Sequence, residues 1–158
     1  MLREIAEQLD RWIIERNFEA EEEGLPQTAQ CTIKVLGQTA LMESGVALAL
    51  AATNDVDVQA DYSYPVQKEF ERLLAQHART LDPVSHEIWM PRETRYRELF
   101  SGRFVRVLLA DADAVLLSKA LKAPDKNRVL ITEYLALGAS DRFYRLAQKY
   151  GLDLEQFL

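Results

Sequence analysis

The sequence has few of the residues that mark secreted, membrane or fibrous proteins. It contains one cysteine, Cys31, which excludes an internal disulfide. Its longest wholly apolar run, residues 46–52, is far too short to cross a bilayer, and its first residues lack the basic-then-apolar layout of a secretion signal. Six glycines and five prolines among 158 residues exclude collagen-like and low-complexity chains. We therefore expect a soluble cytoplasmic protein without a membrane partner, with Cys31 as a buried structural thiol.

Charge is plentiful, but it is unevenly distributed. The chain has 19 basic and 25 acidic side chains and a net charge of −6, and an acidic chain is a poor candidate for nonspecific nucleic-acid binding. Residues 89–128 depart from this balance, with nine basic and five acidic side chains. Two interpretations stay open: a solvated surface, or a wall that faces an anion such as a phosphate. The arginines concerned are Arg92, Arg95, Arg97, Arg103 and Arg106.

The hydrophobic pattern predicts a single mixed α+β domain over residues 1–158. Apolar residues at helical spacing predict a helix over residues 2–20, within an N-terminal part of residues 1–30. Residues 31–110 are predicted to form a small mixed sheet of about four strands packed by helices, and residues 111–158 a helical C-terminal part. The expected strands are residues 31–36, 55–60, 86–90 and 104–109. The further expected helices are a short one after Gly37, residues 65–79, 112–122 and 124–137, and one that Ser140 caps.

Asp55 and Asp57 are the most informative pair in the sequence. They stand at positions i and i+2 of a predicted strand, so both side chains point to the same face. Two carboxylates held together need a cation or basic group nearby, and Mg²⁺ is usually held by one or two carboxylates plus substrate phosphates. A solvated sheet face is the alternative. An EF-hand is excluded, because Ala60 and Val66 occupy the positions that require glycine and glutamate.

A candidate phosphate-binding element precedes this pair. Gly37, Gln38 and Thr39 follow a predicted strand and open a helix, where free backbone N–H groups and the helix dipole favour an anion. The segment lacks the ending of a Walker A loop and the pattern of a dinucleotide-binding fingerprint. A second acidic pair, Asp111 and Asp113, stands at the start of a predicted helix, and helix capping is its favoured interpretation.

The order of these motifs resembles the nucleotidyltransferase (DNA polymerase β-like) superfamily. That family carries a hydrophobic-Gly-Gly/Ser motif, followed by a strand in which two aspartates alternate with hydrophobic residues. Residues 36–41 and 53–58 are similar to these motifs. More narrowly, residues 118–128 add a resemblance to bacterial nucleotidyltransferase-like proteins related to abortive-infection toxins. Two positions depart from the family pattern, because Gln38 replaces the second glycine and Asn127 replaces an aspartate.

The resemblance implies transfer of a nucleoside monophosphate from a nucleoside triphosphate to an RNA, a protein or a small-molecule acceptor. Asp55 and Asp57 would be catalytic and would hold Mg²⁺ with a third carboxylate from a neighbouring strand. Glu87 is the first candidate for that carboxylate, as metal ligand or base, and Asp61 is the second. Gly37 and Thr39, with Gln38 between them, would contact the nucleotide.

Lys119 would neutralise the triphosphate. The alternative interpretation of Lys119 is a surface lysine on an amphipathic helix. Two other functions stay open. A degenerate member of the family would bind a nucleotide or RNA without transfer, and an interaction module would form a homodimer or bind a partner protein through its first helix. Transfer requires three converging carboxylates, binding requires a basic wall alone, and an interaction module requires an exposed apolar patch on that helix.

Overall fold

The computed structural model describes all 158 residues as a five-stranded mixed sheet with six α-helices, so the predicted α+β class is confirmed. The strands are β1 (Cys31–Leu36), β2 (Asp55–Ala60), β3 (Thr80–Leu81), β4 (Tyr96–Ser101) and β5 (Val105–Ala110). The α-helices are α1 (Leu2–Glu23), α2 (Gly37–Ser44), α3 (Tyr64–Ala75), α4 (Ala112–Lys122), α5 (Arg128–Ala136) and α6 (Asp141–Lys149). Two 3-10 helices cover Ser85–Glu87 and Leu154–Phe157.

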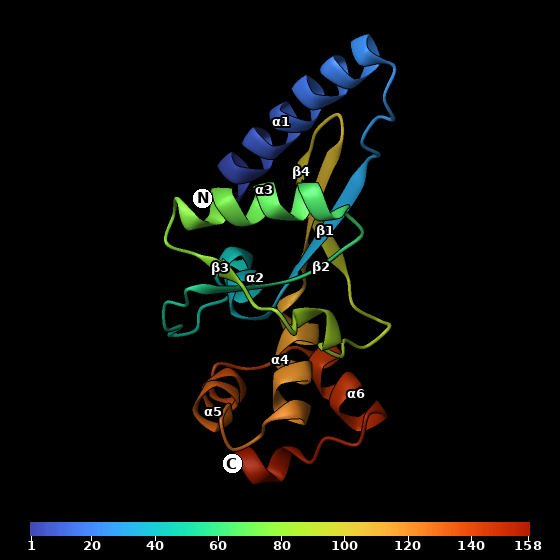
Figure 1. The fold of residues 1–158 in the computed structure, drawn as a ribbon. Helices are drawn as coiled ribbons and strands as arrows, with labels where there is room; N and C mark the ends of the chain where they lie inside the picture. The colour runs from blue at the N-terminus through green and yellow to red at the C-terminus, as the bar shows by residue number, and fades with distance from the viewer.

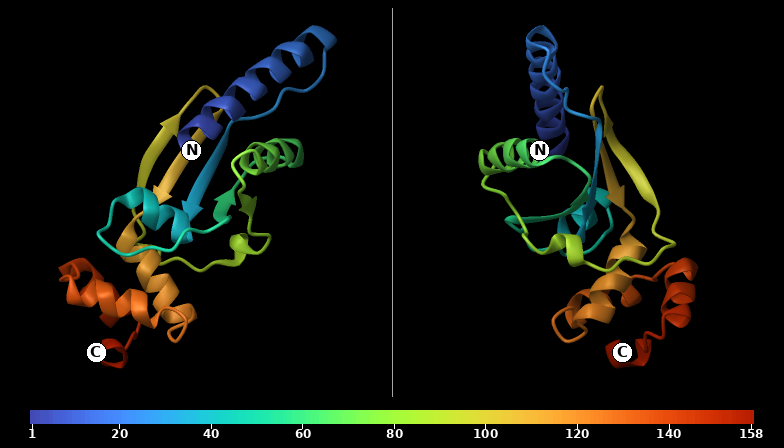
Figure 2. Two further views of the ribbon diagram at one scale, coloured as in Figure 1. Left: turned by 90° about the vertical axis from the view of Figure 1, so that its left-hand side faces the viewer. Right: turned by 45° about the vertical axis from the view of Figure 1, so that its right-hand side comes forward.

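The sheet has the order β3-β2-β1-β5-β4. β1 is parallel to β5 and antiparallel to β2, and the register places Leu36 opposite Asp57. Along β1, Cys31, Ile33 and Val35 are buried and alternate with half-buried polar residues, which is the period of two expected of a strand with one apolar face. α1 and α3 pack against each other on the same side of the sheet (Figure 2).

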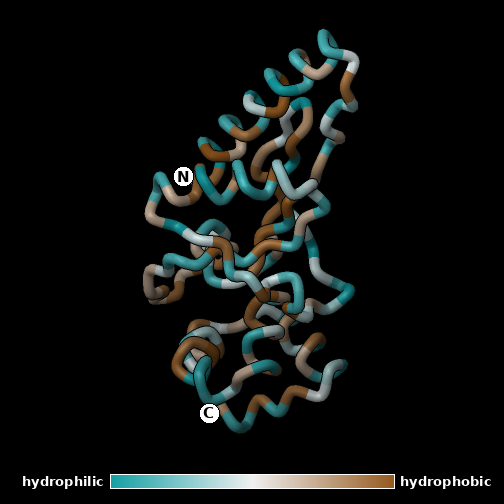
Figure 3. Tube along the Cα trace, viewed as in Figure 1, coloured by the Kyte–Doolittle hydropathy of each residue, from teal (hydrophilic) through white to brown (hydrophobic).

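The three C-terminal helices gather at one end of the sheet, where β5 leads into α4 (Figure 1). Their core contains Leu116, Ile131 and Phe143, which are fully buried. Phe143 also packs edge-on against Tyr134, with 5.2 Å between the ring centroids. Figure 3 shows the hydrophobic residues concentrated along the central strands, and it shows hydrophilic and hydrophobic turns alternating along α1. The predicted helical C-terminal part is therefore observed.

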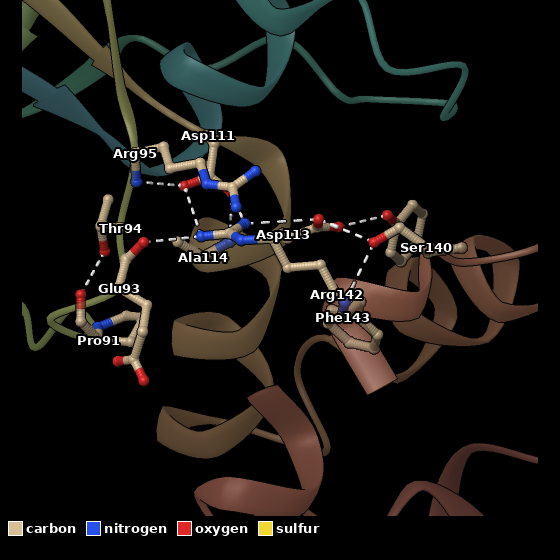
Figure 4. A network of polar contacts seen from close by, with 11 residues as sticks. Pro91, Glu93, Thr94, Arg95, Asp111, Asp113, Ala114, Ser140, Arg142 and Phe143 are labelled. Atoms are coloured by element: carbon tan, nitrogen blue, oxygen red, sulfur yellow. Dashed lines mark hydrogen bonds and ion pairs between the residues drawn. The ribbon is translucent and has the colours of Figure 1, made fainter. Parts of the chain in front are cut away.

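A polar network joins α6 to the start of α4 (Figure 4). Arg142 pairs with Asp111 and Asp113, and it donates to the backbone carbonyl of Glu93 at 2.8 Å. Asp111 is also the N-cap of α4 and accepts from the backbone N–H of Ala114 at 3.2 Å, as the capping interpretation predicts. This second acidic pair is therefore engaged in holding the helices together.

Asp10 fixes α1 to the turn between β4 and β5. The residue is only 8% exposed. Its Oδ1 accepts from the backbone N–H groups of Phe104 at 2.7 Å and Val105 at 3.0 Å, and its Oδ2 accepts from that of Arg103 at 3.1 Å. Gly102 lies so close that a Cβ there would stand 2.5 Å from this carboxylate. A buried charge with three backbone donors therefore locks the first helix to a turn about 90 residues later.

The prediction of a strand over residues 86–90 is wrong. A 3-10 helix ends at Glu87, and the extended segment beyond it is held by side chains instead of a β-ladder. Gln59 donates to the carbonyl of Ile88 at 2.8 Å, and Ser118 donates to that of Trp89 at 2.6 Å. The backbone of this segment is therefore fixed by residues far from it in sequence.

β4 lies between the predicted strands of residues 86–90 and 104–109, where no strand was predicted. It is an edge strand that pairs only with β5, and it contains a bulge between Glu98 and Phe100. Two other elements are shorter than predicted. α3 ends at Ala75, just before Ala78 adopts a left-handed φ of 56°, and α5 begins at Arg128 after a turn.

Cys31 is buried, as predicted. Burial, together with the negative charges of Asp61 and Asp10, raises the pKa of its thiol to about 11. A thiol in this environment is a poor nucleophile. No helix of the structure combines the length and the hydropathy that crossing a membrane requires.

Candidate functional site

A cleft of about 170 Å³ lies where β2, the segment after β3 and α4 meet. Its lining contains two carboxylates, from Asp57 and Asp82, and three ammonium groups, from Lys119, Lys122 and Lys126. The carboxylates come from the sheet side, and the lysines come from α4 and the turn after it. The cleft therefore has one acidic and one basic wall, which suits a cation together with phosphate oxygens.

Asp57 stands on the strand face opposite to the core. Val56 and Val58 on either side of it are buried, while Asp57 is half-buried at the cleft. Burial is the main cause that raises the pKa of Asp57 to about 6, and it acts together with a hydrogen bond that the protonated carboxyl group donates to Asp82 and with the charge of Asp82. Lys119 acts in the opposite direction. The two carboxyl groups are therefore close enough to share a proton.

Asp82 reaches this position through the pairing of β3 with β2. The two strands run parallel, and the backbone N–H of Asp82 extends the pairing by donating to the carbonyl of Val56 at 3.1 Å. Asp82 was not among the predicted site residues, because an aspartate followed by a proline is typical of a turn. The available signal was a carboxylate directly after a two-residue strand, and such a strand is too short to show a periodicity.

Lys119 is half-buried on α4. Burial lowers the pKa of its ammonium group, Lys126 and Lys122 lower the pKa further by repulsion, and the charge of Asp57 opposes these effects. Asn127 closes the end of the same helix by donating from its amide nitrogen to the carbonyls of Lys119 and Ala123, both at 3.0 Å. An aspartate at position 127 would repel these carbonyl oxygens, so the end of α4 favours the amide donor of asparagine.

Gly37 brings the start of α2 against Asp57. It is buried and left-handed, with a φ of 61°. A Cβ there would overlap Oδ2 of Asp57 and would lie 3.1 Å from its Cγ. Only glycine therefore permits this approach, and Gly37 lines the cleft.

The two residues after Gly37 do not line the cleft. The side-chain amide of Gln38 donates to the carbonyl of Ala51 at 3.0 Å, which holds the long connection between α2 and β2. Thr39 is 7% exposed within α2. Of the three residues predicted to bind the nucleotide at this motif, the structure brings only Gly37 to the cleft.

Asp55 lies near Asp57 but outside the cleft lining. It is exposed, and its Oδ1 accepts from the hydroxyl group of Thr80 at 2.9 Å. Its charge contributes to raising the pKa of Asp57, so the two residues interact electrostatically. No three His, Cys, Asp or Glu side chains converge on one point that could hold a metal ion.

Neither candidate for the third carboxylate is in the cleft. Glu87 has an exposed side chain at the end of a 3-10 helix and lines a neighbouring cavity, because the strand expected to carry it does not form. Asp61 accepts from the backbone N–H of Thr32 at 2.7 Å, beside the first residues of β1. The structure therefore places Asp82, and neither of these two residues, beside Asp57.

The arginines of the basic stretch do not line the cleft either. Arg106 pairs with Glu98 at 3.0 Å, and Arg97 donates to the carbonyl of Glu43 at 3.1 Å. The cations that face the carboxylates are the three lysines at the C-terminal end of the same stretch.

The pKa of Asp57 predicts a measurable pH dependence of stability. A carboxyl group with a raised pKa in the folded state adds stability below its unfolded pKa, and this stability is lost as the pH rises through the folded value. The free energy of unfolding of the wild type, minus that of Asp57→Asn, should therefore fall between about pH 4 and about pH 7. Urea denaturation of both proteins across this range measures the difference. A difference that is constant or rises with pH contradicts the raised pKa.

The arrangement can bind a divalent cation and a polyphosphate at once. Two carboxylates on adjacent strands supply hard oxygen ligands, and three lysines on the opposite wall supply phosphate-binding charge.

Comparison with known proteins gives no relative from which a role can be transferred. No protein-family model matches the chain, and no curated protein or solved structure matches it either.

Proposed function

We propose that the chain binds Mg²⁺ and a nucleoside triphosphate in this cleft and transfers a nucleoside monophosphate to an acceptor hydroxyl group. The acceptor oxygen loses its proton and bonds to the α-phosphorus, the bond between the α- and β-phosphates breaks, and pyrophosphate leaves. The observation that carries the proposal is the half-buried pair Asp57 and Asp82, which faces three lysines across one cleft. The resemblance of the motifs around Gly37 and Asp57 to nucleotidyltransferases supports the same chemistry.

The donor chemistry of the acidic wall fits Mg²⁺. Asp57 retains a proton up to about pH 6, because burial and the neighbouring Asp82 disfavour its negative charge. A divalent cation would neutralise both carboxylates and replace that proton, and two carboxylates are sufficient where substrate phosphates complete the coordination. Asp57 and Asp82 would hold the ion, and Asp55 would add negative potential. The bound ion would supply charge neutralisation at the phosphates and acidify the acceptor hydroxyl group.

The basic wall would bind the triphosphate. Lys119 is half-buried, so its attraction for a phosphate oxygen is screened less by water than that of an exposed lysine. Lys122 and Lys126 would neutralise the remaining charge and orient the phosphate chain along α4. Gly37 leaves room for the carboxylate of Asp57 beside the backbone, because a side chain at position 37 would overlap its Oδ2.

Nucleotide binding without transfer is the second candidate function. The observation that favours it is that Asp55 is turned to Thr80, so the three converging carboxylates expected for transfer do not meet at one point. Transfer in this cleft would rely on Asp57 and Asp82, with the substrate phosphates as the remaining ligands of the ion. The third possibility, an interaction module built on α1, has less support. The apolar residues Leu2, Ile5, Leu9 and Ile13 of that helix are buried inside the protein. We propose the cytoplasm as the location, since nucleoside triphosphates are held there.

Calorimetric titration with ATP, with and without Mg²⁺, tests the binding. Asp57→Asn and Asp82→Asn should each weaken Mg²⁺-dependent binding by about tenfold or more, since a hydrogen-bonded charged group is worth roughly 1.5–3 kcal/mol. Glu7→Gln is the matched control, because it removes the same charge from an exposed position on α1, away from the cleft, and should leave the affinity unchanged. Equal effects of all three substitutions would point to a nonspecific charge effect and contradict the proposal.

Label incorporation separates transfer from binding alone. The protein is incubated with Mg²⁺, each nucleoside triphosphate labelled at the α-phosphate, and RNA or protein acceptors. Transfer places the label on the acceptor and should be lost in Asp57→Asn. Tight Mg²⁺-dependent binding without incorporation into any acceptor would favour the binding function.

A further inference from the structure

A second cavity adjoins the cleft and is mostly apolar. We call it the aromatic cavity, and its volume is about 490 Å³. Its lining residues are Glu87, Trp89, Ser118, Leu121, Lys122 and Tyr150. Ser118 and Lys122 also line the cleft, so the two spaces share a wall on α4.

The backbone between the two spaces explains how they are separated. Ile88 and Met90 line the cleft, while Trp89 between them lines the aromatic cavity, as expected of alternating side chains in an extended segment. Ser118 donates to the carbonyl of Trp89 at 2.6 Å and thereby fixes the segment to α4. One short segment therefore presents aliphatic side chains to the cleft and an indole ring to the aromatic cavity.

The indole ring of Trp89 is positioned as a stacking surface. Trp89 is 46% exposed, and it meets the ring of Tyr150 edge-on with 5.1 Å between centroids. The hydroxyl group of Tyr150 is in turn held by Glu93. An aromatic side chain that is supported by a second ring and open to solvent on an apolar cavity is the usual platform for a planar heterocycle.

We infer that the aromatic cavity takes the nucleobase of the nucleotide whose phosphates occupy the cleft. This inference rests on the proposed function. The cleft and the aromatic cavity differ in charge. Lys119 and Lys126 line only the cleft, and Glu87 lines only the aromatic cavity. Lys122 stands on the shared wall, where the sugar and first phosphate of such a ligand would pass. The carboxylate of Glu87 is an acceptor for N–H groups at the edge of a base.

Tryptophan fluorescence provides a direct test. The chain has two tryptophans, so Trp12→Phe leaves Trp89 as the sole reporter. Mg²⁺ complexes of ATP, GTP, CTP and UTP are titrated in turn, with Mg²⁺–tripolyphosphate as the ligand that lacks a base. We expect at least one nucleotide to quench Trp89. Tripolyphosphate should bind, as measured by calorimetry, without quenching.

Substitution of the ring gives an independent readout. Trp89→Ala should weaken binding of the quenching nucleotide by roughly 5- to 150-fold, the range for loss of one stacked base, and should leave the affinity for tripolyphosphate unchanged. Trp89→Phe should restore most of the affinity. Circular dichroism and thermal denaturation check that both variants fold.

The failures are distinguishable. If nucleotides and tripolyphosphate bind equally well and Trp89→Ala affects neither, the base lies elsewhere and the inference is overturned while the proposed function stands. If neither type of ligand binds, the proposed function fails and the inference fails with it.

Discussion

Replacement of Asp10 by alanine is expected to lower the free energy of unfolding by about 3–4 kcal/mol, one of the largest single effects in this protein. The substitution removes the acceptor of three backbone N–H groups in the turn between β4 and β5, one of which belongs to the buried Val105. A buried donor left without a partner costs about 1–3 kcal/mol, and part of this cost disappears where water reaches the turn. Urea denaturation measures the loss.

Two further variants show whether the acceptor role of Asp10 is responsible. Asp10→Asn retains one side-chain oxygen, so it should preserve part of the bonding and lose less stability than alanine. Glu7→Ala removes an exposed carboxylate one turn earlier on α1 and should change the free energy of unfolding by less than about 0.5 kcal/mol. If Asp10→Ala and Glu7→Ala cost the same, Asp10 does not hold the turn.

Gly37→Ala should damage the candidate site more than any other removal or addition of a single methyl group. The added Cβ would overlap Oδ2 of Asp57, so either the start of α2 or the carboxylate must move. A left-handed backbone adds about 1–2 kcal/mol of strain for a residue with a side chain. We expect a loss of Mg²⁺–ATP affinity of about tenfold or more together with lower stability. Calorimetry and urea denaturation measure the two effects.

Gly45 offers a matched control for the backbone strain. It ends the same helix with a φ of 74°, and a Cβ at that position would meet no atom within 4 Å. Gly45→Ala should therefore cost stability alone and leave nucleotide affinity unchanged. In an Asp57→Ala background the overlap is removed, so Gly37→Ala should then cost no more stability than Gly45→Ala. A larger cost in that background would assign the defect to another contact of Gly37.

Local sequence patterns were sufficient to predict the strands and helices that bury one of their faces against the core. Buried residues alternate with more accessible ones along β1 and β2, and Asp111 and Ser140 cap α4 and α6 as predicted. β4 escaped prediction for two physical reasons. It is an edge strand, where charged side chains are tolerated, and the bulge after Glu98 interrupts the period of two.

The site was predicted in part for a comparable reason. The positions of Asp55 and Asp57 follow from the geometry of one strand, and Gly37 follows from the start of one helix. The neighbour of Asp57 depends instead on β3, a strand of two residues that pairs with β2 across 25 positions of the chain. Glu87 was favoured because a strand was expected around it, and long-range bonds from side chains such as Gln59 and Ser118 replace that strand. No local pattern encodes contacts of this kind.

The burial of Cys31 makes the wild-type chain a convenient host for site-specific chemistry. Its thiol is shielded and is almost entirely protonated at neutral pH, so maleimides and iodoacetamides encounter no competing native sulfur in the folded protein. Two introduced cysteines, one on an exposed surface of α1 and one on an exposed surface of α5, would then be the only residues to carry a spin label or fluorophore. Distances between α1 and the C-terminal helices, with and without a nucleotide, become accessible without first replacing a core residue.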